Sequence, residues 1–188
     1  MKTITKSQLS CLPNSGDVTK RFIEQTNNAD EPVEIISLYG GKNTIGDLCW
    51  LAYAVCEPKK IDKFIKDLAL VNVASIKDYC NGNDYDTVIK FLNGHGGFEP
   101  ETIESIARDC IVNAEWYAGE SFEFIGDKAY KELHKVQDAA FAVISATEEY
   151  DSSDDELDDI PAVDVAYYLL KQSDGKFDFK PYLMELFS

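Results

Sequence analysis

The chain has 188 residues and a formal net charge of −16, from 34 acidic and 18 basic residues. This charge excludes a broad duplex-binding surface, which needs clustered lysine and arginine, and it argues against docking on anionic lipid. Hydrophobic residues make up 45% of the sequence, which excludes a wholly disordered chain. We therefore expect one folded, soluble, cytoplasmic domain over residues 1–188, with no direct nucleic-acid or membrane partner.

The first third of the sequence predicts two short helices. One covers Ser7 to Leu12, and the other begins near Asp17 and carries Val18 and Phe22 at helical spacing. The run VEIISL from Val33 is short and rich in β-branched residues, so it fits either a strand or a helix, and we favour a helix.

The middle of the sequence predicts a helical hairpin and one further helix. A largely buried helix begins at Asn43 or Thr44 and is ended by Glu57 and Pro58. Pro58 suits the first turn of the next helix, which extends to Tyr79. After a polar turn, residues 84–92 form a short helix that Asn93 and Gly94 terminate.

The last part of the sequence predicts three more amphipathic helices. The first starts at Pro100 and places Tyr117 on its inner stripe, and residues 119–127 connect it to the next helix. The second spans residues 127–147 with Tyr130 inward, and the third spans residues 161–171 with Tyr167 inward. The aromatic segment 177–187 is expected to pack back on the core.

Amphipathic helices joined by short loops, with almost no period-two segment, indicate an all-α fold. The expected architecture is a multi-helix bundle or a helical array, and strands are not expected.

The order of these segments resembles immunity proteins of bacterial toxin and immunity loci, which have relatives in phages. The likeness covers most of the chain in outline, through ITKSQLSCLPNSGDVTKRFIEQ, GDLCWLAYAVCEPKKIDKFIKDLALVNVASI and DYDTVIKFLNG. It depends on eight positions: Ile4, Thr5, Leu9, Cys11, Phe22, Asp47, Trp50 and Leu51. The alanine-rich stretches of such proteins are thinned here to Ala139-Ala140, Ala142 and Ala166-Tyr167-Tyr168. The resemblance implies a helical inhibitor of a toxin or a defence protein in a bacterial or phage-infected cell.

An acidic segment at 148–159 is the most distinctive feature of the sequence. It reads EEYDSSDDELDD and carries −8, half of the total charge. One interpretation is a solvated loop that keeps the protein soluble. The other is a surface that attracts and orients a basic partner protein. The residues expected to bind such a partner are Glu148, Glu149, Tyr150, Asp151, Asp154, Asp155, Glu156, Asp158, Asp159 and Phe122.

An interface of this kind also needs an apolar anchor. The candidates are Trp116, Tyr117, Phe122 and Phe124, with Tyr150 inside the acidic segment, and core packing is the preferred interpretation for Trp116. Self-association stays open, because Phe122 and Tyr168 could serve it equally well.

Neither a cofactor nor a metal site is expected. The acidic segment lacks the central glycine and terminal glutamate of an EF-hand loop, and the five scattered cysteines contain no CxxC pair. The expected function is therefore non-enzymatic inhibition or neutralisation of a basic protein, either a toxin or a nucleic-acid-binding defence protein.

Two alternatives remain. The protein could mimic DNA and block a nucleic-acid-binding enzyme, with acidic residues such as Glu101, Glu104 and Asp109 extending the charged surface. It could also be a small enzyme with a carboxylate pair or a cysteine nucleophile, with His95 or His134 as the base.

Overall fold

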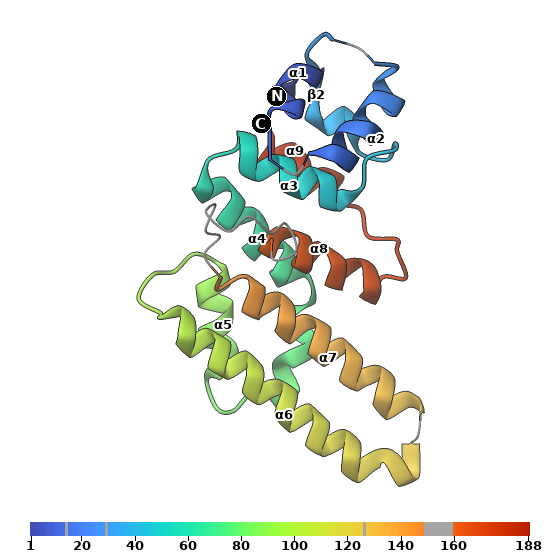
Figure 1. Ribbon diagram of the computed structural model, residues 1–188. Coiled ribbons are helices and arrows are strands. Elements are labelled where there is room, and N and C mark those ends of the chain that lie inside the picture. Colours follow the sequence, from blue (N-terminus) through green and yellow to red (C-terminus); the bar gives the residue numbers. More distant parts are fainter. Residues whose placement is uncertain (14, 29, 126, 149–159) are drawn as a thin grey trace. The chain divides into compact units, whose positions relative to one another are not determined.

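The computed structural model describes residues 1–13, 15–28, 30–125, 127–148 and 160–188, with the backbone alone for residues 120–125 and 127 (Figure 1). Helices make up 71% of the structure, and the described residues contain only one pair of two-residue strands, so the predicted all-α class is confirmed. No helix in these ranges is long and apolar enough to cross a membrane.

The helices group into two compact units. The described part of the first unit comprises residues 1–64, 160–163 and 178–188, and that of the second comprises residues 65–148 and 164–177. Two compact units can belong to one domain, so the division does not test the expected single domain over residues 1–188, which stays a prediction. Helix α4 (Pro58–Asn72) and helix α8 (Pro161–Gln172) each contribute residues to both units.

The first unit contains the chain termini and a small hydrophobic core. Its elements are β1 (Thr3–Ile4), α1 (Lys6–Ser10), α2 (Gly16–Thr26), β2 (Val33–Glu34), the 3-10 helix η1 (Ile35–Leu38), α3 (Ile45–Val55) and α9 (Lys180–Leu186). Phe179 and Phe187 are 1% and 0% exposed, which confirms that the aromatic tail packs back. The Lys2 amide donates a 2.7 Å hydrogen bond to the Phe187 carbonyl, which explains why both termini lie side by side in Figure 1.

The prediction of a helix over Val33 to Leu38 is only half right. Residues Val33 and Glu34 pair antiparallel with β1, in the register Thr3 to Glu34 and Ile4 to Val33. Residues Ile35–Leu38 form the 3-10 turn η1, which buries Ile35 and Leu38. The strand exists because the N-terminal segment supplies a partner from far away in sequence, which local periodicity cannot reveal.

The second unit is built around a long helical hairpin. Its elements are η2 (Val73–Tyr79), α5 (Asp84–Leu92), α6 (Pro100–Ile125) and α7 (Asp127–Ser145), together with the second parts of α4 and α8. Helices α6 and α7 run antiparallel, and η2 and α5 pack against α6 (Figure 1). The predicted connection over residues 119–127 is wrong, because α6 continues to Ile125. Gly119 is the one strong helix breaker before Gly126, and a glycine costs only about 1 kcal/mol in a helix.

A partly buried ion pair organises the first unit. The Arg21 guanidinium donates two hydrogen bonds to the Asp47 carboxylate, at 2.7 and 2.6 Å. Asp47 is 5% exposed and also completes a capping box with Thr44 at the start of α3, as predicted for that helix start. The hydrogen bond to Asp47 raises the pKa of Arg21. One carboxylate therefore caps α3 and fixes α2 beside it.

We expect Asp47→Ala to lower the free energy of unfolding by about 2–4 kcal/mol, because it removes the helix cap and leaves Arg21 without its partner. Urea denaturation at pH 7 measures this loss. Asp30→Asn changes the net charge by the same amount at an exposed position, and it should stay within about 0.5 kcal/mol of the parent protein. Equal stabilities for the two variants would contradict this role of Asp47.

Candidate binding surface

An exposed aromatic cluster lies on helices α7 and α8 of the second unit. The Phe141 ring stacks on the Tyr168 ring, with centroids 5.7 Å apart and an interplanar angle of 21°. Tyr167 meets Tyr168 edge-on at 5.8 Å. Phe141 is 37% exposed and Tyr167 is 59% exposed, so the cluster offers apolar surface to solvent. We call Phe141, Tyr167 and Tyr168 the aromatic patch.

Polar contacts between α7 and α8 hold the patch in place. The Lys171 ammonium lies 2.6 Å from the Asp138 carboxylate, which is 4% exposed. One residue further along α8, the Gln172 amide donates to the Lys135 carbonyl at 2.9 Å. Asp138 and Phe141 lie one turn apart on α7, and Tyr168 and Lys171 lie one turn apart on α8. Joining Lys171 to Asp138 therefore brings Tyr168 onto Phe141.

The patch lies in a negative local field. Burial is the main reason why the pKa of Tyr168 is raised, and the charges of Asp164, Asp138 and Glu148 raise it further. Lys171 neutralises part of this charge through Asp138. The charges of two further carboxylates, on Asp164 and Glu148, thus act on the Tyr168 ring, and Glu148 is the first residue of the acidic segment.

The predicted binding residues fall into three groups. Glu148 is exposed and lies near Tyr168, as described above. Phe122 lies near the end of α6, within residues 120–125, for which only the backbone is described. The remaining residues lie outside the described part of the chain: Glu149, Tyr150, Asp151, Asp154, Asp155, Glu156, Asp158 and Asp159.

Several aromatic side chains predicted to face inward are exposed instead. Tyr117 is 51%, Tyr130 55% and Tyr167 59% exposed, so their assignment to inner stripes is wrong. Trp116 is 59% exposed, so the preferred core interpretation is also wrong for this residue. Tyrosine and tryptophan carry polar groups, and their apolar rings alone do not decide which side of a helix is buried.

Trp116 and Val112 form a second exposed apolar pair, on the outer stripe of α6. They lie one turn apart and are 59% and 61% exposed. Next to Trp116 on this helix, Tyr117 meets its ring edge-on with centroids 5.2 Å apart, and Glu115 accepts a hydrogen bond from Gln137. This pair therefore offers apolar surface on a different helix from the aromatic patch.

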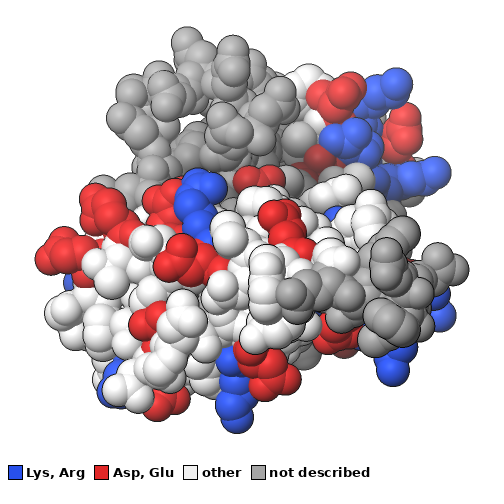
Figure 2. Space-filling view, turned by 90° about the horizontal axis from the view of Figure 1, so that it is seen from below, with Lys and Arg blue, Asp and Glu red and all other residues white. Residues whose placement is uncertain are grey.

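Acidic side chains do not form a continuous row on the face drawn in Figure 2. On this face the carboxylates of the described residues gather in separate groups, and lysine or arginine side chains lie between some of them. A DNA mimic would present closely and regularly spaced negative charges. The mimicry alternative stays a prediction without a specific feature of this face in its favour.

Two hollows in the described structure were considered as ligand sites. One, of about 550 Å³, is lined by the first turns of α2 and α3 and by Arg21, whose guanidinium is already held by Asp47. The other, of about 240 Å³, lies beside Tyr79 and Tyr117 in the second unit. Neither hollow is lined by a cluster of three aromatic rings like that of the aromatic patch, so the aromatic patch is the better candidate for a protein partner.

One cysteine and one histidine available to the enzyme alternative make other contacts, whereas His95 is exposed in the loop before α6. Cys49 is fully buried in α3, and this burial raises its pKa to about 12. The His134 ring packs edge-on against Tyr130 at 4.4 Å, and its Nδ1 lies 3.2 Å from the Gln137 amide oxygen. Within the described residues, no group of three or more histidine, cysteine or acidic side chains is arranged to hold a metal ion.

We expect the phenol of Tyr168 to ionise above the ordinary tyrosine value of about 10, because burial and the neighbouring carboxylates disfavour the phenolate. The difference between the ultraviolet pH titrations of the parent protein and Tyr168→Phe isolates this phenol. Added salt or Glu148→Gln should lower its pKa part of the way. Stability supplied by the protonated phenol is present at neutral pH and is lost as pH rises through the raised pKa. An ordinary, salt-independent pKa would contradict the negative field.

Comparison with known proteins adds no further information about this site, because no family model, curated protein or solved structure matches the chain. The resemblance to immunity proteins of toxin loci therefore remains a prediction.

Proposed function

We propose that this protein is a non-enzymatic binding protein that inhibits or neutralises a partner protein with a basic surface. The observation that carries the proposal is the aromatic patch, in which the rings of Phe141, Tyr167 and Tyr168 contact one another at the surface and the charges of Glu148 and Asp164 act on Tyr168. Buried aromatic side chains supply much of the binding energy in protein interfaces, and charges at the rim orient the partner.

The acidic segment gives the patch a means of attracting its partner. Residues 148–159 carry half of the net charge of −16, and they follow the patch-forming helix α7 in the chain. Clustered like charges raise the local concentration of an oppositely charged protein and accelerate its association. In this proposal the segment increases the association rate, and the aromatic patch decreases the dissociation rate.

The resemblance of the sequence to immunity proteins suggests which partners to consider. A toxin that acts on nucleic acid, or a defence protein that binds it, has the basic surface that this account requires. The proposed setting is the cytoplasm of a bacterial or phage-infected cell, where free cysteines are compatible with the reducing conditions.

The partner can be identified by site-specific photo-crosslinking in the producing cell. A benzophenone side chain at position 167 should form an adduct with a protein of basic isoelectric point. The same side chain at position 116 is the matched control, because Trp116 is exposed to the same extent, 59%, but lies on α6 outside the aromatic patch. No adduct at position 167, an acidic partner, or equal adducts at both positions would contradict the proposal.

Neutralising the acidic segment should slow association with that partner by about tenfold at low salt and flatten its salt dependence. The changed residues are Asp154, Asp155, Glu156, Asp158 and Asp159, each replaced by the corresponding amide. A control variant replaces five exposed acidic residues elsewhere with amides: Asp30, Glu31, Glu34, Glu57 and Asp174. Stopped-flow association rates should fall much less in the control. Equal association rates for the two variants would mean that the acidic segment only keeps the protein soluble.

A further inference from the structure

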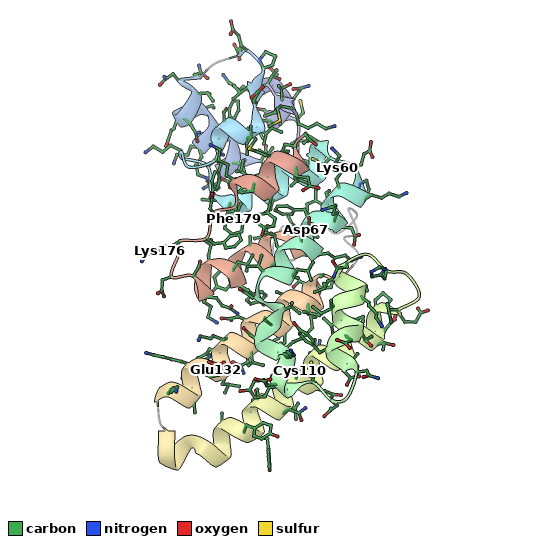
Figure 3. All side chains as sticks on the ribbon, turned by 180° about the vertical axis from the view of Figure 1, so that it is seen from behind. Lys60, Asp67, Cys110, Glu132, Lys176 and Phe179 are labelled. Carbon is green, nitrogen blue, oxygen red and sulfur yellow. The ribbon has the colours of Figure 1, made fainter. Side chains whose placement is uncertain are left out.

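Two cysteines that are far apart in sequence meet in the second unit. Cys80 follows the last residue of η2, and Cys110 lies near the middle of α6 (Figure 3). Their Sγ atoms are 2.8 Å apart, as two free thiols that share a hydrogen bond. A disulfide bond is about 2.05 Å long, so the sulfur atoms need to approach by roughly 0.8 Å, which small side-chain rotations supply.

Two contacts fix the end of η2 against α6 beside the two thiols. The Asn113 side chain, one turn beyond Cys110 on α6, donates a 2.8 Å hydrogen bond to the carbonyl of Tyr79, the residue before Cys80. The Tyr79 ring also packs edge-on against Tyr117 of α6, with centroids 5.9 Å apart. The end of η2 is thus fixed to α6 on one side of the cysteine pair, which keeps the sulfur atoms together without a covalent bond.

The two thiols differ in accessibility in the way that a reactive pair requires. Cys110 is 0% exposed, whereas Cys80 is partly exposed and can meet a small solute. The hydrogen bond between the two thiols lowers the pKa of Cys80 and raises that of Cys110. Cys80 is therefore the attacking thiolate, and Cys110 is the thiol that resolves the product.

We propose that Cys80 and Cys110 form a reversible dithiol–disulfide site that reacts with peroxides. The Cys80 sulfur attacks one peroxide oxygen, the O–O bond breaks, and hydroxide leaves and is protonated to water. The Cys110 sulfur then displaces the hydroxyl of the Cys80 sulfenic acid, so that an S–S bond forms, the S–O bond breaks and a second water leaves. Two thiol hydrogens and one hydrogen peroxide are converted to two water molecules, and a dithiol reductant reverses the oxidation.

Oxidation would change the second unit by closing the chain between residues 80 and 110. The enclosed segment contains α5 and the glycine-rich loop before α6. A cross-link over this length restricts the unfolded chain and stabilises the folded one. The oxidised protein should therefore unfold at a higher temperature, and α5 should exchange its amide hydrogens more slowly.

The test uses the full chain with Cys11→Ser, which removes an exposed thiol that could cross-link two molecules. Treatment with one equivalent of hydrogen peroxide should remove the mass of two hydrogen atoms, and peptide mapping should join Cys80 to Cys110. The melting temperature should rise by about 5–10 °C and return after dithiothreitol. Cys80→Ser and Cys110→Ala, made separately in this background, should each abolish both changes.

Other products would overturn the proposal. Addition of oxygen to Cys80 without loss of the Cys110 thiol would mean that the pair only shares a hydrogen bond. A disulfide that involves Cys49 or Cys56 would also overturn the proposal. So would the absence of any reaction at a peroxide concentration that oxidises a free cysteine peptide. Because Cys80→Ser alters only a partly exposed position, it keeps the test informative even if Cys110→Ala fails to fold.

Discussion

The contact between Lys171 and Asp138 determines what the second unit can present to a partner. Asp138 is almost fully buried, and its carboxylate lies 2.6 Å from the lysine ammonium, so α8 is fixed along α7 at one register. That register stacks Tyr168 on Phe141 and leaves Tyr167 exposed beside them. A buried charge that loses its partner is costly, so the ion pair favours this arrangement over neighbouring registers. The geometry of the aromatic patch follows from this one interaction.

Most of the fold could be predicted from the sequence, because caps and helix breakers are local signals. Thr44 begins α3, Pro58 begins α4, and residues 84–92 form α5 as expected. The errors arose where tertiary packing decides. Strands β1 and β2 form only by pairing with each other, and α6 continues through Gly119. Trp116 and Tyr167 lie on exposed faces, although their apolar rings suggest burial.

The candidate site could be predicted only in part. Composition identified the acidic segment, and its first residue, Glu148, lies near the aromatic patch. The sequence offers Trp116, Phe122 and Tyr150 as anchors because aromatic side chains dominate interface energies. Phe141 and Tyr168 meet only after α7 and α8 pack together, just as Cys80 and Cys110, 30 residues apart, meet only in the folded unit. Spacing within one segment carries no information about such pairs.

The central claim is that the aromatic patch anchors a basic partner. The most direct test compares the dissociation rates of Tyr167→Ala and Trp116→Ala in complex with the protein that position 167 captures. Both parent side chains are 59% exposed, so neither change should affect folding strongly. An anchoring role predicts that Tyr167→Ala dissociates about 30-fold faster than the parent, while Trp116→Ala dissociates at the parental rate. Equal dissociation rates for the two variants would contradict the account.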